Sequence, residues 1–587
     1  MKRGLVLLCP FLVLLLLAAK PSAEPPAASK ALAAIVGDYE KWQLDQNPFA
    51  RLQQGLRVTR LPDYSYEGEE KEAAFCRALR ERLARVDAQG LSHEEWLTRE
   101  ILDWQLGVSI EGLEHVRNIF QITPYNAPLR SPLHQVFTGF AFDADEDLDR
   151  YLDLMRQYAA AIDQLRANLQ IQRGNEVLLP KAEIEPVVSF VRSFIRSPEQ
   201  SLFAVSTARL SEIDAPRAAA FQAEVRILVE TLVNPALERL AALPDSPDYR
   251  KVAPDRVGLG QYLGGQEAYR YLVRSHTTLD LTPEEIHRRG LAEVARLNAS
   301  LDEARKKIGF AGSPEDFRHF LKTDPRFFAR TPEEVAERLM APIRRLEPRL
   351  GDFFLRTPKA PYGVARLESA LEGPMTYGFY QQPTPARAEG DYLFNGSRLD
   401  ERPLLSAAAV VFHELIPGHH LQVSLQMENE ALPDFRRLLY PTAFLEGWAM
   451  YASGLAMEMG GYTDPYDLAG WIADDLLLSS RLVVDTGMNA YGWQRQQAID
   501  YMKANTLESG TQIGTETLRY AVDTPGQALA YKMGSDKIWE LRHKAEKELG
   551  KKFDLRRFHD AVIGSGAMPM TVLEKHVTWW IGGEKRR

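Results

Sequence analysis

The sequence contains little cysteine, since Cys9 and Cys76 are the only two in 587 residues. If the first residues are removed as predicted below, one thiol remains and no intramolecular disulfide can form. A lone cysteine beside alanine and phenylalanine, as at Cys76, is typical of a small buried hydrophobic side chain. The packing of apolar side chains must therefore stabilise the fold, and a chain of this length has enough of them.

Long basic runs are also scarce. The chain has 80 acidic and 71 basic residues, which gives a net charge of −9. Acidic surfaces repel a phosphate backbone, so the composition argues against nucleic acid as a partner. Hydrophobic residues make up 45% of the chain, charged residues 26% and aromatic residues 10%. This composition excludes a disordered chain and a protein with many membrane spans, and it is typical of a large globular protein.

One apolar run lies at the N-terminus. Lys2 and Arg3 precede an apolar stretch from Gly4 to Ala19, and the small residues Pro21-Ser22-Ala23 follow it. A basic head, an apolar middle and a small-residue end are typical of a secretory signal peptide. The run is shorter than a membrane span, which needs about 20 apolar residues. We therefore predict a cleaved signal peptide over residues 1–23.

A flexible leader is predicted over residues 24–30, where proline and alanine dominate. A lipoprotein interpretation through Cys9 is weaker, because most of the apolar run follows that cysteine. These features predict a secreted or periplasmic protein with no stable membrane anchor after the signal peptide is cleaved.

Helical periodicity dominates the rest of the chain. Charged and apolar residues recur at helical spacing over residues 69–86, 93–109, 145–171 and 217–243. The segment Thr282–Glu285 combines a capping threonine, a proline and two glutamates, and predicts a helix from Pro283 to about Lys307. Between residues 363 and 395, glycines, aromatics and alternation predict short strands instead. The expected fold class is mainly α, a large multi-helix fold with a small β-sheet element before the helix described next.

One apolar helix carries an unusual number of polar groups. The stretch Val410–Gln422 contains His413, Glu414, His419 and His420. Burying these groups without partners would cost several kcal/mol. Zn2+ would satisfy them, because neutral imidazole and carboxylate are natural zinc ligands. The stretch therefore predicts a zinc site.

The spacing of these histidines departs from the zinc motif H-E-x-x-H, which places two imidazoles one helical turn apart. Pro417 stands where the second histidine of that motif would be. Because Pro417 lacks the N–H that would bond to the His413 carbonyl, we expect the helix to kink or bulge there. Such a bulge can bring His419 to the metal. The glycine before His419, as in related metallopeptidase motifs, favours this residue, and His420 remains the alternative ligand.

A third ligand is expected from a later helix. Glu446 lies near the start of the predicted helix that contains Leu445–Ala452. Zincins of the glutamate-ligand type take their third ligand from such a helix, and three protein ligands leave the fourth position open to water. The predicted metal ligands are therefore His413, His419 and Glu446.

The site sequence resembles a bacterial family. His-Glu-x-x-Pro-Gly-His-His-x-Gln, followed by Glu-Gly-Trp-Ala-x-Tyr-Ala, is similar to the proteins grouped as domain of unknown function 885, which are placed with the glutamate-zincin metallopeptidases. The similarity continues over Leu281–His287, Arg481–Met488, Pro525–Gly534 and Phe558–Asp560. The resemblance implies a zincin-like fold and one catalytic unit over residues 31–587. That unit is divisible into an N-terminal helical lobe, 31–250, and a catalytic lobe, 251–587.

Zincin chemistry suggests roles for the residues around the metal. Glu414 is predicted to be the general base, which takes a proton from the metal-activated water and passes it to the leaving amine. Tyr531 is predicted either to donate a hydrogen bond to the oxyanion or to be a buried tyrosine bonded to a carbonyl. Trp448 is expected to pack in the core.

Further side chains are candidates for positioning or for binding substrate. Arg481 and Asp485 stand four residues apart on one helix, which predicts an ion pair or, alternatively, a role in orienting a zinc-ligating histidine. Arg519, with its neighbour Tyr520, is a weaker candidate for binding a substrate carboxylate. The predicted strand around Tyr377 offers a sheet edge that could align an extended peptide.

Together these features predict an exported zinc-dependent metallopeptidase that acts on peptides or oligopeptides. One alternative is a protein of the cell envelope that binds peptides without cutting them, because His420 would close the coordination sphere if it joined the other ligands. A second alternative is a zinc hydrolase of another amide or of an ester. The sequence leaves the oligomeric state open.

Overall fold

The helix predicted from its cap is present. The computed structural model describes residues 26–125, 128–368, 372, 378–384 and 387–587, and it contains helix α12 at Pro283–Ile308. The Thr282 hydroxyl accepts a hydrogen bond from the Glu285 N–H, and the Glu285 carboxylate accepts one from the Thr282 N–H. These two bonds satisfy backbone donors that the helix leaves free at its start.

The N-terminal helices pack against one another and against the helices of the candidate site. They are α1 (Ala27–Gln46), α2 (Pro48–Gln53), α3 (Tyr66–Ala84) and α4 (His93–His115). Helices α3 and α4 confirm the predictions for 69–86 and 93–109. Leu79 and Leu102 are buried in the same hydrophobic core as Trp448 and Tyr451 of the later helix α20. Cys76 is buried in this core as a free thiol, as expected.

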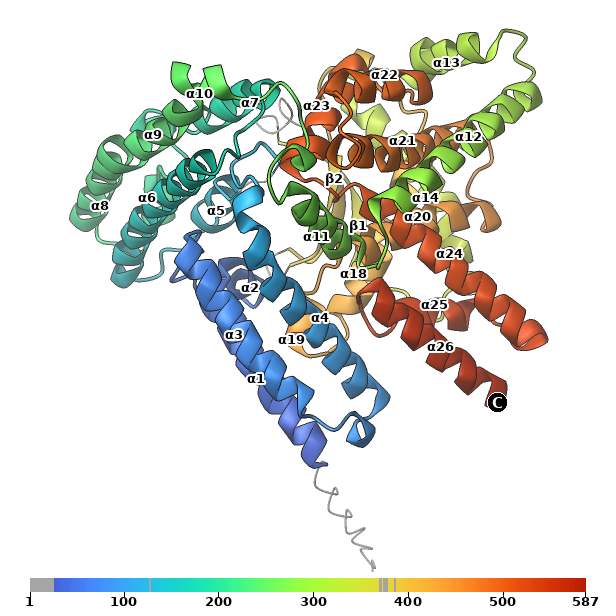
Figure 1. Cartoon of the computed structure of the whole chain (residues 1–587), viewed down its shortest axis with the longest axis horizontal. Helices are drawn as coiled ribbons and strands as arrows, with labels where there is room; N and C mark the ends of the chain where they lie inside the picture. Colours follow the sequence, from blue (N-terminus) through green and yellow to red (C-terminus); the bar gives the residue numbers. More distant parts are fainter. Residues whose placement is uncertain (1–25, 126–127, 369–371, 373–377, 385–386) are drawn as a thin grey trace, which may run out of the picture.

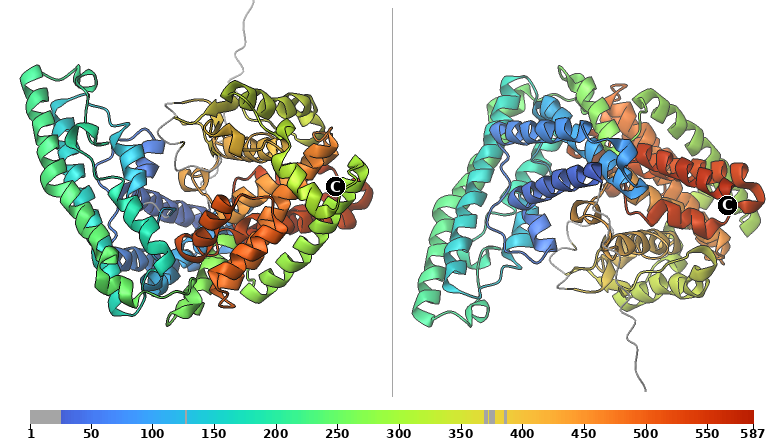
Figure 2. Two further views of the ribbon diagram at one scale, coloured as in Figure 1. Left: turned by 90° about the horizontal axis from the view of Figure 1, so that it is seen from above. Right: turned by 90° about the horizontal axis from the view of Figure 1, so that it is seen from below.

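A second group of helices, drawn in teal and green, lies on one side of the molecule (Figures 1 and 2). It comprises α5 (Arg130–Pro132), α6 (Asp145–Gly174), α7 (Lys181–Arg192), α8 (Ala215–Leu228), α9 (Asn234–Asp245) and α10 (Pro247–Val252). The helix predicted over 145–171 is α6, but the one predicted over 217–243 is split by a π-helical turn at Val229–Val233. Pro235, in the first turn of α9, has no N–H to continue the α-helical ladder, which explains the wider turn.

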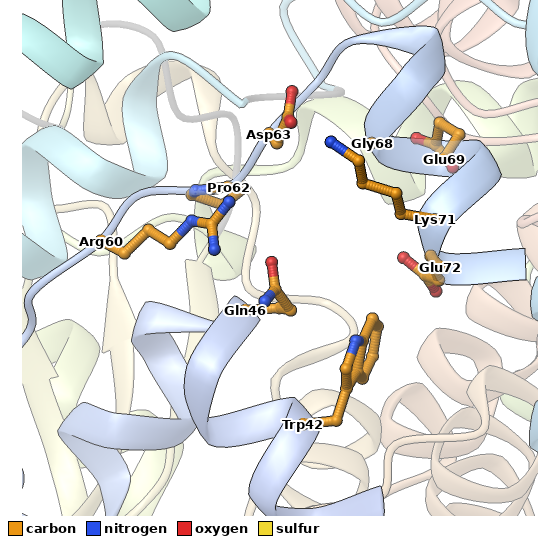
Figure 3. Close-up of a pocket in the computed structure, with 9 residues that line it drawn as sticks. All are labelled: Trp42, Gln46, Arg60, Pro62, Asp63, Gly68, Glu69, Lys71 and Glu72. Carbon is orange, nitrogen blue, oxygen red and sulfur yellow. The ribbon is translucent and has the colours of Figure 1, made fainter. Parts of the chain in front are cut away.

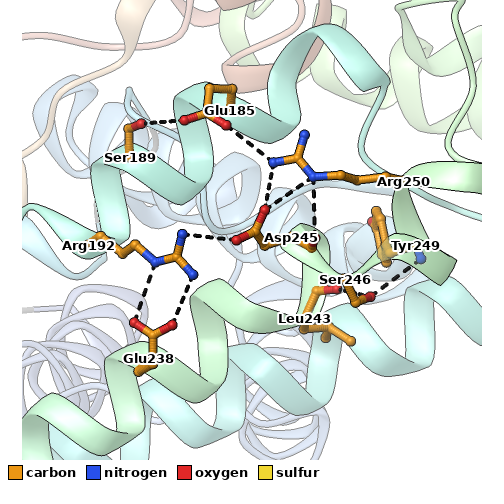
Figure 4. Close-up of polar contacts among 9 residues, drawn as sticks. All are labelled: Glu185, Ser189, Arg192, Glu238, Leu243, Asp245, Ser246, Tyr249 and Arg250. Carbon is orange, nitrogen blue, oxygen red and sulfur yellow. Dashed lines mark hydrogen bonds and ion pairs between the residues drawn. The ribbon is translucent and has the colours of Figure 1, made fainter.

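Ion pairs on the surface of this group hold α7 against its neighbours (Figure 4). Arg192 lies 2.9 Å from both Glu238 and Asp245, and Arg250 lies 2.7 Å from Asp245 and 3.2 Å from Glu185. Each exposed pair contributes less than about 1 kcal/mol to stability, but the connected network restricts where α7 can lie.

The remaining helices form the other side of the molecule (Figure 1). Besides α12 they are α11 (Gly265–Thr277), α13 (Pro314–Thr323), α14 (Pro332–Leu346), α15 (Leu350–Phe353), α17 (Ala407–Glu414), α18 (His419–Met427), α19 (Asp434–Arg437), α20 (Thr442–Glu458), α21 (Pro465–Asn489), α22 (Arg495–Asn505), α23 (Gly510–Leu518), α24 (Leu529–Leu549), α25 (Leu555–Ile563) and α26 (Met570–Arg586). Every residue of α21 from Ser479 to Asn489 is buried. Such a helix lies inside the protein, and its polar side chains need partners on several neighbouring elements.

The predicted strands form one small sheet. It consists of β1 (Tyr362–Arg366), β2 (Gly378–Gln381) and β3 (Gly390–Phe394) in the order β1-β3-β2. Strand β1 runs parallel to β3, and β2 runs antiparallel to β3 with Tyr380 opposite Tyr392. Strand β2 is therefore an edge strand. The predicted fold class is confirmed, because the molecule is mainly α and its small sheet precedes α17.

The N-terminal predictions are only partly covered by the structure. The predicted signal peptide, 1–23, lies outside the described residues. The predicted leader, 24–30, differs from the structure in its second half, because α1 already begins at Ala27. Alanine is the strongest helix former, which explains the early start. Within the described ranges, no helix is long and apolar enough to cross a membrane. The division into lobes at residue 250 stays a prediction.

Candidate metal centre

The helix that carries the candidate site breaks at Pro417. Helix α17 ends at Glu414 and α18 begins at His419, so the expected kink is a complete break. Pro417 offers no N–H to the His413 carbonyl, which ends the hydrogen-bond ladder. Gly418 is required at the turn, because a Cβ there would lie 1.8 Å from the His413 carbonyl oxygen. After the break the chain continues as a separate helix, α18, so the helical spacing counted from His413 no longer applies to His419.

The break brings two imidazoles to one carboxylate. His413 and His419 each place Nε2 3.3 Å from the same carboxylate oxygen of Glu446, which lies on α20. The two imidazole rings are nearly perpendicular, with their centroids 4.8 Å apart. Ligand atoms of all three residues lie within 4.8 Å of one another. The structure thus brings the three predicted metal ligands together, and we call them the ligand group.

The packing of α20 positions Glu446. Trp448 is fully buried, as expected, and its indole N–H donates to the Pro417 carbonyl at 3.0 Å. Gly447 and Gly534 let α20 and α24 approach closely, since a Cβ on Gly534 would lie 1.9 Å from a backbone carbonyl of α20. Trp448 therefore links the helix of the carboxylate to the turn between the two histidines.

Charge and burial oppose each other within the ligand group. Burial raises the pKa of Glu446, but the two imidazoles outweigh burial and hold this pKa far below its usual value. Burial lowers the pKa of His413, but the hydrogen bond to Glu446 and the charge of Glu414 leave this pKa above its usual value. The Glu446 carboxylate therefore favours a positive charge beside it.

The donor set of the ligand group fits zinc. Two imidazoles and one carboxylate are ligands that zinc prefers, and three protein ligands leave a fourth coordination position. The Nδ1 atom of His419 is buried, with no hydrogen-bond partner among the residues that the structure describes. A metal would bind the other nitrogen of this ring, Nε2, which lies 3.3 Å from Glu446, and would leave Nδ1 unpartnered.

His420, the alternative ligand, points elsewhere. It is fully buried, with Nδ1 3.0 Å from the Tyr380 hydroxyl and Nε2 3.1 Å from the Ala360 carbonyl oxygen. Burial lowers the pKa of His420 to about 4, so its neutral ring can donate one hydrogen bond and accept one. Both ring nitrogens are engaged, and the structure does not bring His420 into the ligand group.

Glu414 lies against the edge of the sheet. It is the last residue of α17, and its carboxylate accepts a hydrogen bond from the Tyr380 backbone N–H of β2. Burial raises the pKa of Glu414, partly offset by the charges of His413 and His419. The strand is thus adjacent to the predicted general base. Tyr377, named with this strand, lies outside the described residues.

Tyr531 of α24 lies beside the ligand group. Its ring stacks on His413 with centroids 6.3 Å apart. Arg519 donates a hydrogen bond to its hydroxyl, and the Arg481 guanidinium carbon lies 5.0 Å from its ring centroid. Burial and the charge of Glu446 raise the pKa of Tyr531 to about 12, although the two arginines oppose the shift. The hydroxyl is therefore neutral near pH 7 and able to donate.

Arg481 and Asp485 do not pair with each other, which corrects the predicted ion pair. Arg481 donates to the Tyr520 hydroxyl at 2.7 Å and to the Glu516 carboxylate at 3.2 Å. Asp485 accepts from the Tyr269 hydroxyl at 2.7 Å and from a backbone N–H at 3.0 Å. On a helix that is buried all round, residues four apart can reach different neighbouring elements, so helical spacing does not identify their partners.

Two acidic residues near the ligand group escaped the sequence analysis. Asp474 of α21 lies close enough to His413 for its charge to raise the pKa of that imidazole. Glu516 of α23 is 2% exposed and contacts both Arg481, at 3.2 Å, and Arg519, at 3.5 Å. The available signals were weak, because Asp474 only interrupts an apolar helix and Glu516 only precedes Arg519 by three residues.

A cavity of about 360 Å³ lies elsewhere, at α1, α3 and the segment between α2 and α3 (Figure 3). It is lined by Trp42, Gln46, Arg60, Pro62, Asp63, Gly68, Glu69, Lys71 and Glu72. Burial raises the pKa of Glu69 to about 7, and the charges of Glu72 and Asp63 add to the shift. None of these residues belongs to the ligand group.

The solved structures that are similar to this chain include two candidate lipoproteins. One is a candidate lipoprotein from Colwellia psychrerythraea, with 24% identity, a TM-score of 0.86, and coverage of 95% of this chain and 99% of that chain. The other is a candidate lipoprotein of unknown function from Shewanella oneidensis, with 18% identity, a TM-score of 0.67, and coverage of 94% and 99%. These likenesses show the fold alone.

None of the curated proteins compared with this chain matches it. A family model described as "Bacterial protein of unknown function (DUF885)" matches residues 48–577. This match covers most of the chain, including α17, α18, α20 and the whole ligand group. The protein therefore belongs to the bacterial family of unknown function DUF885.

Proposed function

We propose that this protein is an exported zinc-dependent peptidase whose chemistry resembles that of the glutamate zincins. The observation that carries the proposal is the convergence of His413, His419 and Glu446, with Glu414 next to them in the chain. The ligand group is partly exposed, with 12% of the His413 side chain and 20% of the Glu446 side chain accessible. Three ligands at an accessible position are typical of catalytic zinc sites, whereas structural sites are closed by four.

A zinc ion held by His413, His419 and Glu446 would polarise a substrate carbonyl and acidify a water molecule. Glu414 would take a proton from water and pass it to the leaving amine. The Tyr380 N–H fixes the orientation of the Glu414 carboxylate, and therefore where the proton is taken up. Glu414 alone would therefore accept the proton from water and deliver it to the leaving amine.

Two further elements would act on a peptide. Tyr531 can donate its hydroxyl proton to the oxygen that becomes negative in the transition state, and the loss of such a donor typically costs about 2.7–4 kcal/mol. Strand β2 is an edge strand beside Glu414. An extended peptide can pair with such an edge through main-chain hydrogen bonds, which would place its scissile bond near the ligand group.

Two alternatives to a peptidase were predicted. The binding protein would need a fourth metal ligand, whereas the other hydrolase would differ only in its substrate. A closed structural site would need a fourth protein ligand, and the engagement of His420 with Tyr380 and Ala360 argues against it. Hydrolysis of another amide or of an ester would use the same residues as peptide hydrolysis. Trials with peptides and with simple esters distinguish these two reactions.

Export is part of the proposal. The N-terminal sequence has the features of a signal peptide. The similar solved structures from Colwellia psychrerythraea and Shewanella oneidensis are described as candidate lipoproteins, which are proteins of the cell envelope. Export to the cell envelope agrees with both observations, whereas a lipid anchor would differ from the predicted absence of a stable membrane anchor.

Metal analysis of the purified protein tests the ligand group. We expect about one zinc ion per chain in the wild type. His419→Ala should lose most of this zinc because it removes a ligand, whereas the neighbouring variant His420→Ala should retain it. The proposal is contradicted if the wild type, after incubation with zinc, holds less than about a tenth of an equivalent. Zinc loss in His420→Ala alone would exchange the roles of the two histidines.

The variant Glu414→Gln tests the general base. It should retain zinc but cleave a peptide library, followed by mass spectrometry, about 10²–10⁴-fold more slowly than the wild type. Glu430→Gln, which removes an exposed carboxylate in the turn after α18, is the matched control and should cleave normally. Retained activity in Glu414→Gln would remove this residue from the role of base. Intact peptides with the wild type would favour the binding alternative.

A further inference from the structure

Two buried arginines near the ligand group share one carboxylate. Glu516 lies 3.2 Å from Arg481 and 3.5 Å from Arg519. Within the part of the chain that the structure describes, no second carboxylate lies within 4.0 Å of either guanidinium. The charges of Asp474 and Glu446 also reach Arg481, and those of Asp485 and Asp523 reach Arg519, but Glu446 is engaged with the two imidazoles. Arg481, Arg519 and Glu516, which we call the arginine corner, carry one excess positive charge when counted by themselves.

Arg519 also has an unused hydrogen-bond donor. Its other contacts besides Glu516 are neutral, namely the Gln527 side-chain carbonyl at 2.8 Å and the Tyr531 hydroxyl. Its Nε is buried without a partner among the described residues, while 14% of its side chain remains accessible. Tyr125, 38% exposed, lies over it, with 5.0 Å between the Arg519 guanidinium carbon and the ring centroid. Excess charge and a partly accessible guanidinium side chain are what an arginine needs to bind a carboxylate from outside.

The arginine corner adjoins the proposed reaction site. Tyr531 connects the two, because its ring stacks on His413 and its hydroxyl accepts a hydrogen bond from Arg519. Arg519 therefore lies one hydrogen bond beyond the Tyr531 hydroxyl, which is the group proposed to act on the substrate oxygen at the ligand group. An extended peptide advances about 3.3 Å per residue. A peptide with a carbonyl at the ligand group would place a carboxylate at Arg519 after about one to three residues.

We propose that Arg519, supported by Arg481, binds the free C-terminal carboxylate of the substrate. The inference rests on the proposed peptidase function and specifies it as a carboxypeptidase that releases short C-terminal fragments. A peptide that continued past this point would cover the arginine corner without supplying a negative charge, which leaves a buried cation unpaired. The arginine corner thus selects chain ends over internal bonds.

A cleavage assay tests the preference for free ends. Zinc-loaded wild type is incubated with N-acetylated hexapeptides of mixed sequence, either as free acids or as C-terminal amides. We expect kcat/KM for the acids to exceed that for the amides about 10- to 100-fold, because the amide loses a charge-assisted pair with arginine. The fragments released should come from the C-terminal end. Equal cleavage of acids and amides would overturn the inference and leave the peptidase function standing.

A binding assay separates failure of the inference from failure of the proposed function. Zinc-loaded Glu414→Gln protein is equilibrated with an equal mixture of the two peptide libraries, and the retained peptides are counted by mass spectrometry. Enrichment of the free acids by about 10-fold or more supports the carboxylate site even if the wild type cleaves neither library. Equal retention of both libraries, or retention of neither, overturns the inference.

Substitutions assign the preference to the arginine corner. In Arg519→Gln the ratio of acid to amide binding should fall to about 1, and in Arg519→Lys, which keeps the charge but not the planar fork, it should be intermediate. Arg192→Gln removes an arginine from the network of Figure 4 and is the matched control. The ratio of acid to amide binding is measured within a single sample of each variant. A lower yield of folded protein therefore does not affect it. An unchanged ratio in Arg519→Gln would overturn the assignment.

Discussion

At the scale of single residues, glycine at position 418 allows the chain to turn back between His413 and His419. Any side chain there would collide with the His413 carbonyl, so the chain can turn back at this point only with glycine. The missing N–H of Pro417 predicted the interruption from the sequence, and the glycine favoured His419. The choice against His420 could not be derived in the same way, because its partners come from the region of the sheet.

The variant Gly418→Ala tests this dependence. Its Cβ must displace the backbone between the two histidines, so zinc affinity should fall about 10-fold or more. Gly37→Ala is the matched control, because Gly37 lies inside α1 with nothing within 4 Å of an added Cβ. The control should keep its zinc affinity and gain about 0.5–1 kcal/mol in the free energy of unfolding. Zinc titration and chemical denaturation measure both effects, and normal zinc binding by Gly418→Ala would refute the role of the glycine.

At the scale of elements, α7 meets a π-helical turn through two buried acids. The turn, Arg519–Asp523, follows α23 and carries part of the arginine corner. Glu183 of α7 is 1% exposed and Asp523 is 4% exposed. Burial raises the pKa of Asp523 to about 6, and burial together with the charge of Asp523 raises the pKa of Glu183 well above its usual value. The two carboxyl groups also share a side-chain hydrogen bond, in which the protonated Glu183 is the donor.

This contact predicts how stability depends on pH. Because the pKa of Glu183 is higher in the folded than in the unfolded protein, its contribution to stability is lost as the pH rises through the folded value. Glu183→Gln cannot ionise, so its free energy of unfolding at pH 8 should exceed that of the wild type by about 1–3 kcal/mol. The gain should vanish as the pH falls to 4.5, the ordinary value for glutamate.

Glu185→Gln is the matched control for this measurement. Glu185 lies on the same helix, but its side chain is 70% exposed and pairs with Arg250 on the surface. Its substitution should change stability by less than about 0.5 kcal/mol at either pH. Chemical denaturation at the two pH values gives both differences. A Glu183→Gln protein that is less stable than the wild type at pH 8 would contradict the prediction.

At the scale of the whole molecule, the N-terminal helices are built into the core of the site helices. Tyr39 of α1 packs edge to face on Phe435 of α19, with 5.6 Å between ring centroids, and Glu40 accepts the Phe435 N–H at 3.0 Å. Arg436 is 1% exposed and donates to Thr98 of α4 at 3.0 Å. These contacts join residues on both sides of position 250.

A truncated chain tests how far the two sides depend on each other. Residues 251–587 alone would expose the apolar surface that α1, α3 and α4 cover, so this fragment should lack a cooperative thermal transition and should bind zinc weakly. Residues 26–587 provide the control and should unfold cooperatively. Circular dichroism and zinc titration make the comparison. A fragment 251–587 that folds cooperatively would support the predicted division into two independent lobes.

Local patterns in the sequence predicted the elements but not their long-range partners. The cap at Thr282, the strands before α17 and the three members of the ligand group follow from residues that are near one another in the chain or from motif spacing. The partner of Arg481 does not, because Glu516 lies on another helix that packs from a different direction. Such contacts depend on how buried helices pack against one another. The spacing of residues along a single helix does not predict that packing.

The position of α1 in the core also affects how the chain is made. Glu40 and Phe435 are 395 residues apart, so the first helix leaves the ribosome long before the segment that covers it. The part of α1 that packs on α19 stays uncovered until most of the polypeptide has been synthesised, although α3 and α4 can cover its other contacts early. A translocation pore that accepts only unfolded polypeptides would therefore receive a chain in which this last contact has not yet formed.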